Sequence, residues 1–497
     1  MRFIFRLDFG AQIGWGHLSR SIAISEALIA TGHEVVIATQ SRPDSHPKLK
    51  QLVSSKVLEV QSISHDKTLR KNNTSSFPIG KLESLDAIET IKLVDRVKAD
   101  VLVLDHYGLR SQWLREVRKR LPVCHISDYP TETEVDFILD YGFDATPDKH
   151  RRGTGSRTKL MLGSAFAPVG ENYARFSEPP KGISNELNSV LVSLGGFGGG
   201  SLATRILQTL DILAPAAEVH FAGDPSNYSA LSSDSQARKV TYAQEASLAP
   251  LFESAGLAIV GAGVTMYELV ASGSLGLVVQ TAKNQELALM SAIEKDFVLG
   301  IQNPTTEQLE QKMRETLLGR STTHRLEWLK ARSLVDHLGP TRLALKLGGQ
   351  GSTQPELREV KVSDMPFLLR IANQSSSRLA SPNSHQVEPK EHWEWSQGFF
   401  DGSKRGWVFG AGELPIGHCR LEREDSKFYL SYSIQEEFQG EGWGPKMLQA
   451  LLDKPSFPVE VFARVKTNNA PSLKVLQNAG FVPLTSQGEL LTLVRKV

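Results

Sequence analysis

Cysteine is nearly absent from this chain of 497 residues, which contains only Cys124 and Cys419. The two lie far apart in the sequence and outside any spacing that metal ligands use, so neither a disulfide framework nor a zinc site is expected. We expect both thiols to be buried and to pack as small apolar side chains.

Long apolar runs and an excess of one charge are also missing. No stretch approaches the roughly 18 apolar residues of a membrane span, and Arg2 and Arg6 interrupt the apolar start of the chain, which lacks the core of a signal peptide. The 56 Lys and Arg residues nearly balance the 55 Asp and Glu residues, so the net charge of +1 gives no general attraction to nucleic acid or anionic membranes. We expect a cytoplasmic protein without nucleic-acid or membrane partners, whose anionic ligands are held by local groups.

The length favours about three domains, at roughly 150 residues each. Short apolar runs alternate with amphipathic stretches through residues 1–165 and again through 166–345, which is typical of strand-helix-strand units around a parallel sheet. The glycine-rich segment 346–356 is expected to be a linker, and residues 357–497 form a third domain. The predicted fold class is α/β, with two Rossmann-like halves followed by a smaller α+β domain.

The first candidate site follows the apolar run Phe3–Phe5, where Gly14 and Gly16 lead into His17. A strand, a glycine loop and a helix N-terminus bring backbone N–H groups up to a ligand. Histidine titrates near neutral pH and can act as a general acid or base. An ordinary strand-to-helix turn, in which the histidine only caps the helix, is the alternative.

A second glycine turn, Gly261–Glu268, follows the apolar run Leu257–Val260. Backbone N–H groups at this helix N-terminus suit a diphosphate, and a carboxylate one turn into the helix can accept both hydroxyls of a ribose. A generic turn with solvated polar residues is the alternative. The residues expected to hold the nucleotide and the sugar are Gly195, Gly263, Val264, Thr265, Glu268, Asn284 and Gln285.

Residues 1 to about 345 resemble the glycosyltransferase-B architecture and, within it, the UDP-sugar hydrolases of pseudaminic acid biosynthesis. The matching stretches are Arg6–Asp8, Ile13–His17, Arg20, Asp105–Gly108, Gly261–Glu268 and Asn284–Gln285. The resemblance implies metal-free hydrolysis of UDP-2,4-diacetamido-2,4,6-trideoxy-β-L-altrose. It also implies that His17 activates the water, that Asp8 orients His17 and that Tyr107 contacts the sugar. Gly14, Gly16 and Arg20 would join the UDP- and sugar-binding residues.

Two stretches depart from that family. Gly195–Gly198 stands where a Gly-Gly-Thr-Asp run is typical, and residues 136–144 match poorly. Nucleotide contacts from the first stretch and the identity of the sugar are therefore open.

The third domain carries a different pair of motifs. The first is a glycine loop at the start of a helix, and the second is an asparagine at the start of a later helix, which ends before Gly480–Phe481. Together they resemble the GCN5-related N-acetyltransferases, and the resemblance implies that the loop binds the pyrophosphate of acetyl-CoA. A phosphate-binding turn in an unrelated α+β domain is the alternative. The expected acetyl-CoA-binding residues are Gln439, Gly440, Gly442, Gly444, Asn469 and Ser472.

The proton donor of this domain is unassigned. Leu476 stands seven residues after Asn469, where many members of the family carry the tyrosine that protonates the departing thiolate. Tyr429 and Tyr432 lie on a preceding strand and must face opposite sides of it, so at most one faces the thioester, and core packing is the alternative for both.

The acetyltransferase base is also open. The stretch Glu391–Trp395 could line an amine pocket with His392 or Glu394 as the base. An amphipathic helix with buried tryptophans explains the same stretch.

The two resemblances together imply a bifunctional enzyme. The third domain would acetylate the 4-amine of UDP-4-amino-4,6-dideoxy-N-acetyl-β-L-altrosamine with acetyl-CoA, and the first two would hydrolyse the product. Two alternatives remain: a glycosyltransferase with a sugar or lipid acceptor in place of water, and a sugar-nucleotide sensor without turnover. The first predicts acceptor-dependent release of UDP, and the second predicts tight binding without turnover.

Overall fold

The computed structural model describes residues 1–10, 15–41, 47–54, 59–63, 79–180, 187–195, 200–223, 240–243, 247–318, 324–349, 354–381, 383–455 and 457–496. They form two compact units. Unit 1 consists of Met1–Phe176, Gly182–Thr322 and Leu334–Gly351, and unit 2 of Ser177–Lys181, Thr323–Ser333 and Ser352–Val497.

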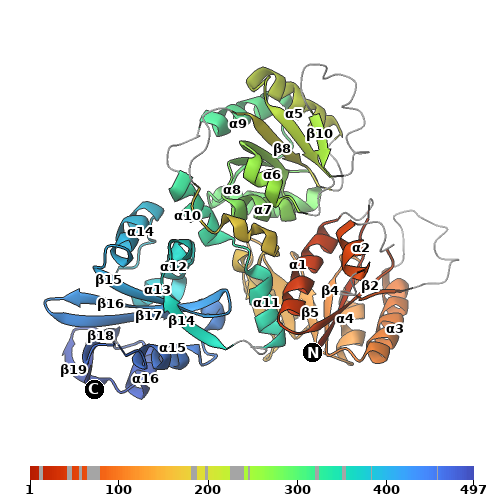
Figure 1. The fold of residues 1–497 in the computed structure, drawn as a ribbon. Coiled ribbons are helices and arrows are strands. Elements are labelled where there is room, and N and C mark those ends of the chain that lie inside the picture. The colour runs from red at the N-terminus through yellow and green to blue at the C-terminus, as the bar shows by residue number, and fades with distance from the viewer. Residues whose placement is uncertain are drawn as a thin grey trace. The chain divides into compact units, whose positions relative to one another are not determined.

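The first half of unit 1 is a parallel sheet in the order β3-β2-β1-β4-β5-β6-β7, with helices on both faces (Figure 1). Its strands are β1 (Arg2–Leu7), β2 (Glu34–Thr39), β3 (Glu59–Ser62), β4 (Val101–Asp105), β5 (Val123–Ile126), β6 (Phe137–Asp140) and β7 (Lys159–Leu162). Its helices are α1 (Gly16–Ala30), α2 (Pro47–Ser54), α3 (Ile79–Val97), α4 (Ser111–Arg118) and the 3₁₀ segments η3 (Asp148–Gly153), η4 (Ser164–Phe166) and η5 (Glu171–Phe176).

Burial on both faces explains the nearly continuous apolar strands of this half. Phe3, Phe5 and Leu7 of β1 enter the core on one face, whereas Ile4 enters the core on the other. The pleat of the strand produces this alternation.

The second half of unit 1 is a parallel sheet in the order β10-β9-β8-β11-β12-β13. Its strands are β8 (Ser189–Ser193), β9 (Glu218–Ala222), β10 (Val240–Ala243), β11 (Leu257–Gly261), β12 (Gly276–Val279) and β13 (Leu299–Ile301). Its helices are α5 (Gly200–Leu213), α6 (Ala249–Ser254), α7 (Val264–Ser272), η7 (Lys283–Gln285), α8 (Glu286–Glu294) and α9 (Thr306–Leu318). The chain then returns to the first half, where α11 (Gly339–Gly348) packs on α1 and adds Leu343 and Leu347 to its core.

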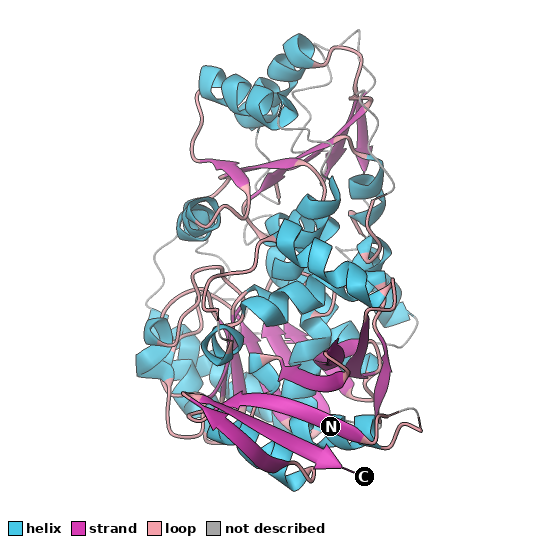
Figure 2. Ribbon diagram, turned by 90° about the vertical axis from the view of Figure 1, so that its left-hand side faces the viewer, coloured by secondary structure: helices cyan, strands magenta, loops and turns pink. Residues whose placement is uncertain are grey.

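Unit 2 is a mixed sheet in the order β14-β15-β16-β17-β18-β20-β19. Neighbouring strands are antiparallel except β17 and β18, which are parallel. Its strands are β14 (Pro355–Glu359), β15 (Lys404–Ala411), β16 (Leu414–Glu424), β17 (Lys427–Ile434), β18 (Glu460–Lys466), β19 (Val482–Gln487) and β20 (Leu490–Lys496). Labelled helices lie on either side of this sheet in Figure 1, and Figure 2 shows its strands in magenta next to the C-terminus.

The helices of unit 2 are α10 (His324–Leu334), η8 (Val362–Asp364), α12 (Met365–Asn373), α13 (Ser375–Ala380), α14 (Pro389–Ser396), η9 (Gln397–Phe399), η10 (Glu436–Phe438), α15 (Trp443–Leu452) and α16 (Ala470–Asn478). Trp328 and Leu329 of α10 join Met365 and Phe367 of α12 in one apolar cluster. The predicted fold class, two Rossmann-like halves followed by an α+β domain, is confirmed.

Both cysteines are buried free thiols, as predicted, and burial raises the pKa of Cys419 to about 12. No helix within the described residues combines the length and the apolar character that a membrane crossing needs.

Candidate functional site

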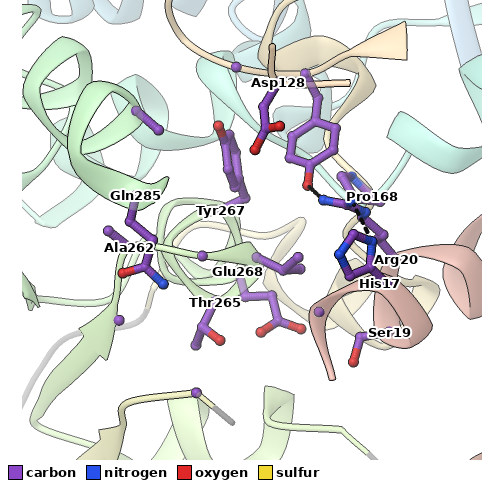
Figure 3. Close-up of a pocket in the computed structure, with 18 of the residues that line it drawn as sticks. His17, Ser19, Arg20, Asp128, Pro168, Ala262, Thr265, Tyr267, Glu268 and Gln285 are labelled. Carbon is purple, nitrogen blue, oxygen red and sulfur yellow. Dashed lines mark hydrogen bonds between the residues drawn. The ribbon is translucent and has the colours of Figure 1, made fainter. Parts of the chain in front are cut away.

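A cavity of about 350 Å³ opens at the carboxyl ends of the strands in both halves of unit 1 (Figure 3). The first half contributes the N-terminus of α1 and the loops that follow β4, β5 and β6. The second half contributes the loops after β8 and β11 and the start of α8. Ligands of open parallel sheets bind at this edge, because the strand-to-helix loops converge there.

His17, in the first turn of α1, is 6% exposed and lines this cavity. Its Nδ1 lies 2.5 Å from Oδ1 of Asp105, the last residue of β4. Arg20 Nη2 is also close to Nδ1, at 2.9 Å, but an ionised carboxylate can only accept, so the hydrogen belongs on Nδ1. The Nε2 lone pair is then available to take a proton.

Asp105 stays ionised although it is fully buried. Burial alone would raise its pKa, but the charges and hydrogen bonds of Arg20 and His17 hold the pKa well below its usual value. Arg20 Nε donates to Oδ2 of Asp105 at 2.6 Å, and Arg20 Nη1 donates to the hydroxyl of Tyr141 at 2.8 Å. Most N–H groups of Arg20 therefore donate to other side chains of the protein, so Arg20 acts as a positioning residue.

Asp8 does not orient His17, contrary to the expectation from the resemblance. Its carboxylate pairs with Arg6 at 2.9 Å and with Nε2 of His106 at 3.3 Å. The orienting carboxylate is Asp105 instead, because α1 carries His17 over the end of β4 rather than the end of β1. A lone carboxylate at the end of an otherwise apolar strand is the signal that could have identified it.

Tyr107 contacts His17 edge-on, with ring centroids 4.8 Å apart, and donates its hydroxyl to Asp128 at 3.0 Å. From the opposite half, the ring of Tyr267 packs on Tyr141 at 5.1 Å. Asp128, Tyr141 and Tyr267 line the cavity but were missed from sequence. For Tyr141 the poor match of residues 136–144 was the available signal.

The second half presents a helix N-terminus to the cavity. Gly263 is the N-cap of α7, whose first turn has no acidic residue and, among the residues that the structure describes, no side-chain cap. Uncapped N–H groups and the helix dipole favour an anion there. Glu268 lies one turn further along, and burial together with this carboxylate raises the pKa of Tyr173 well above its usual value.

The structure brings the predicted UDP- and sugar-binding residues to one cavity, with a single exception. Gly14 lies outside the described residues. Of the residues predicted from sequence, those that line the cavity are Gly16, His17, Arg20, Tyr107, Gly195, Gly263, Val264, Thr265, Glu268, Asn284 and Gln285. Gln285 also fixes its own loop, since its Oε1 accepts from the backbone N–H of Thr281 at 2.9 Å.

A separate glycine loop in unit 2 precedes α15. Gly440 and Gly442 have φ values of +77° and +82°, a region that side chains rarely adopt. Gly442 caps α15, and Gly444 lies in its first turn. Gln439 holds the loop, because its Nε2 donates to the carbonyl of Ile434 at 3.0 Å. Successive N–H groups in such a loop form an anion-binding concavity.

A second helix start lies in the same unit. Asn469 caps α16 by accepting from the N–H of Ser472 at 3.2 Å. The parallel strands β17 and β18 pair only through Tyr429 and Leu430, so they separate beyond these residues.

Residues 356–482 match the acetyltransferase (GNAT) domain family. The C-terminal unit carries a GNAT domain. Such a domain implies acetyl-CoA as the acetyl donor. A ribosomal-protein-alanine N-acetyltransferase from Brucella melitensis is similar to it, with 18% identity, coverage of 28% of this chain and 99% of that chain, and a TM-score of 0.26.

Two further proteins are similar to part of this chain. The UDP-2,4-diacetamido-2,4,6-trideoxy-beta-L-altropyranose hydrolase of Campylobacter jejuni is 19% identical over 212 residues, which are 42% of this chain and 66% of that protein. The match thus spans slightly less than two thirds of that relative. MurG of Acinetobacter baumannii matches 70% of this chain and 99% of its own, with 12% identity and a TM-score of 0.45. The chain therefore joins a region similar to a UDP-sugar hydrolase to a GNAT domain.

In the GNAT domain, Leu476 is buried. Tyr429 and Tyr432 are three residues apart on β17, so they point to opposite faces of the strand. Tyr429 packs on Phe462, whereas the hydroxyl of Tyr432 lies 3.0 Å from Oγ of Ser472 in the first turn of α16. Of the two tyrosines, Tyr432 alone therefore reaches the helix whose start is expected to bind acetyl-CoA.

Proposed function

We propose that the chain is bifunctional. Unit 1 hydrolyses UDP-2,4-diacetamido-2,4,6-trideoxy-β-L-altrose, and the GNAT domain acetylates the 4-amine of the nucleotide-linked precursor. One observation carries the hydrolytic half: the same cavity holds an imidazole fixed by Asp105 and the uncapped N-terminus of α7. Water attack on a glycosyl diphosphate needs a base and an anion site together. The similarity to the Campylobacter jejuni hydrolase supports the identity of the sugar.

His17 acts as the base in this proposal. Its Nε2 takes a proton from water as the water oxygen bonds to the anomeric carbon, and Asp105 stabilises the imidazolium that forms. A positioned base contributes roughly 100- to 10,000-fold to the rate. Tyr107, in contact with the ring of His17, lies where it would meet the sugar.

The leaving group is handled by α7. As the bond from the anomeric carbon to the phosphate oxygen breaks, its electron pair stays on the diphosphate. The N–H groups of Gly263, Val264 and Thr265 stabilise that charge, because they are aimed outward from a helix N-terminus. Glu268, one turn further along α7, accepts the ribose hydroxyls.

The GNAT domain supplies the substrate of this hydrolysis. Its loop with Gly440 and Gly442 holds the pyrophosphate of acetyl-CoA. Asn469 and Ser472, at the start of α16, line another part of the acetyl-CoA site. The amine attacks the thioester carbon, the carbon–sulfur bond breaks, and the thiol leaves with a proton. Acetylation therefore precedes hydrolysis.

A glycosyltransferase is the second candidate for unit 1. A second cavity of about 250 Å³ shares Tyr107 and Tyr129 with the first and is lined further by His106 and His125. It offers room for an acceptor other than water. That activity would release UDP only when an acceptor is present.

The test follows the UDP-4-amino sugar by NMR and mass spectrometry with and without acetyl-CoA, without any added acceptor. We expect acetylation and then release of UDP with the free diacetamido sugar. His17→Ala and Asp105→Asn should acetylate normally but release UDP roughly 100- to 10,000-fold more slowly. Asp95→Asn, which alters an exposed ion pair with Arg120, is the matched control and should behave as wild type.

Two results would contradict the proposal. In the first, the sugar is acetylated but its bond to UDP stays intact until an acceptor is added. That result would make unit 1 a glycosyltransferase. Wild-type rates of UDP release from His17→Ala would remove the imidazole from the mechanism.

A further inference from the structure

Four side chains of unit 2 form what we call the Arg420 cluster: Trp395 of α14, Lys404 of β15, and Arg420 and Glu422 of β16. Arg420 lies over the Trp395 ring at 5.1 Å from its centroid, and the Lys404 ammonium lies over the same ring at 4.4 Å. Lys404 and Glu422 are directly paired across β15 and β16. The cluster is therefore built on two strands and a helix of the GNAT domain, on a single face of the sheet.

The charges of the cluster do not balance. Two cations share the carboxylate of Glu422, at 3.3 Å from Nε of Arg420 and 3.8 Å from Nζ of Lys404. Asp401, a fully exposed carboxylate on the preceding turn, adds a weaker attraction to Lys404. Within the described residues, neither terminal nitrogen of Arg420 has a hydrogen-bond partner. The buried Nε is within ion-pair distance of Glu422 but makes no hydrogen bond to it. Its side chain is 26% exposed, so the free edge is open to a ligand.

Two histidines beside the cluster are also short of partners. His418, two residues before Arg420 on β16, is 4% exposed, and neither of its ring nitrogens has a partner among the described residues. The ring centroid of His392 lies 5.5 Å from that of Trp395, and its buried Nε2 has no hydrogen-bond partner among the described residues. Burial and then the charge of Arg420 lower the pKa of His418 to about 3, so it stays neutral. The surroundings are thus electropositive and rich in unused hydrogen-bonding groups.

The cluster lies one strand away from the gap between β17 and β18. Arg420 is paired with Ser431 of β17, which is the first residue beyond the last contact with β18 at Leu430 and Ala463. The glycine loop expected to hold the pyrophosphate of acetyl-CoA comes after the far end of β17. A ligand on the Arg420 cluster would therefore approach the strand gap without occupying that loop.

We propose that the Arg420 cluster binds the diphosphate of the amine substrate, so that the GNAT domain acetylates a nucleotide-linked amino sugar rather than a free one. The inference rests on the acetyltransferase function proposed above. A guanidinium with both terminal nitrogens free matches two oxygens of a phosphate in a way that an ammonium cannot. The overall reaction is balanced: the amine and acetyl-CoA give the amide and the free thiol of CoA.

The test measures the initial rate of CoA thiol release, which is independent of any later cleavage of UDP. Wild type, Arg420→Gln and Arg420→Lys are compared on the UDP-4-amino sugar and on the same amino sugar without UDP. We expect Arg420→Gln to raise the KM for the UDP-linked amine roughly 10- to 100-fold, as loss of hydrogen bonds to a charged group does. The KM values for acetyl-CoA and for the free amino sugar should not change. The KM of Arg420→Lys for the UDP-linked amine should lie between those of wild type and Arg420→Gln.

Arg423→Gln is the matched control, because Arg423 lies three residues along the same strand, is exposed and carries the same charge. It should leave all three KM values as in wild type. An unchanged KM for acetyl-CoA also shows that Arg420→Gln is folded.

Three results would overturn the inference while leaving the acetyltransferase in place. The first is a wild-type enzyme that prefers the free amine. The second is an Arg420→Gln variant with the wild-type KM for the UDP-linked amine. The third is a raised KM for acetyl-CoA in an Arg420→Gln variant that keeps the wild-type KM for the free amino sugar and is therefore folded. Absence of CoA release from wild type with both amines would remove the inference together with the function on which it rests.

Discussion

At the scale of single residues, the stability of unit 1 depends on buried charged side chains that are paired with opposite charges. Asp8 is 6% exposed. Burial by itself would raise its pKa, but Arg6 and His106 hold the pKa well below its usual value. Because the folded pKa is lower than the unfolded value of about 3.9, Asp8 stabilises unit 1 fully above that pH. This contribution is lost as the pH falls toward the folded pKa.

Asp8→Asn should therefore destabilise unit 1 by about 3 to 5 kcal/mol at pH 7, since it leaves Arg6 with one buried partner fewer. The deficit should shrink by about 1 kcal/mol between pH 7 and pH 3, because the wild-type stabilisation weakens there. Hydrogen exchange of the β1 and β4 amides measures the free energy of opening of this unit alone. Asp95→Asn should stay within about 0.5 kcal/mol of wild type. A deficit that is independent of pH would show that the charge of Asp8 is not what stabilises the fold.

At the scale of elements, the loop before α15 requires glycine for its backbone rather than for space. Gly440 has a φ of +77° and no atom within 4 Å of the position that a Cβ would take. Gly440→Ala should cost roughly 1 to 2 kcal/mol through left-handed strain alone. We expect a several-fold higher KM for acetyl-CoA in CoA-release assays, because the strained loop rotates its N–H groups away from the pyrophosphate.

Gly412→Ala is the control for that prediction. Gly412 has a φ of +59° in the turn between β15 and β16, so the substitution imposes similar strain away from the loop. Its KM for acetyl-CoA should equal that of wild type. Equal effects of the two substitutions would indicate general destabilisation instead of a phosphate-binding loop.

The elements also show what could be predicted from sequence. Buried parallel strands were predictable, because runs such as Val101–Leu104 are apolar throughout, and so were the glycine turns that begin α7 and α15. The partner of His17 could not be predicted, because it depends on the strand order β2-β1-β4. This order places Asp105 rather than Asp8 beneath α1. The Arg420 cluster was not predictable either, since Trp395 meets Arg420 only through packing of α14 on β16.

At the scale of the whole molecule, the two units divide the proposed chemistry between separate sites. The residues of the cavity around His17 all belong to unit 1, and those of the glycine loop and the Arg420 cluster all belong to unit 2. In the proposed function, the acetylated nucleotide sugar made by unit 2 is the substrate of unit 1. Joining the units in one chain would raise the local concentration of this intermediate, and we predict that each unit acts independently of the other.

A mixture of two inactive variants tests that independence. His17→Ala alone should convert the UDP-4-amino sugar to the acetylated UDP-sugar and stop, whereas Gly442→Val alone should leave the amine untouched, because φ of +82° at the cap of α15 excludes a branched side chain. Mixed at equal concentrations, the two should produce free diacetamido sugar, because the intermediate diffuses from one protein to the other. A lag that shortens as total protein is raised should precede the steady rate. Mass spectrometry of the time course would show both species, and a mixture that accumulates the acetylated UDP-sugar without cleavage would mean that hydrolysis requires an intact acetyltransferase in the same chain.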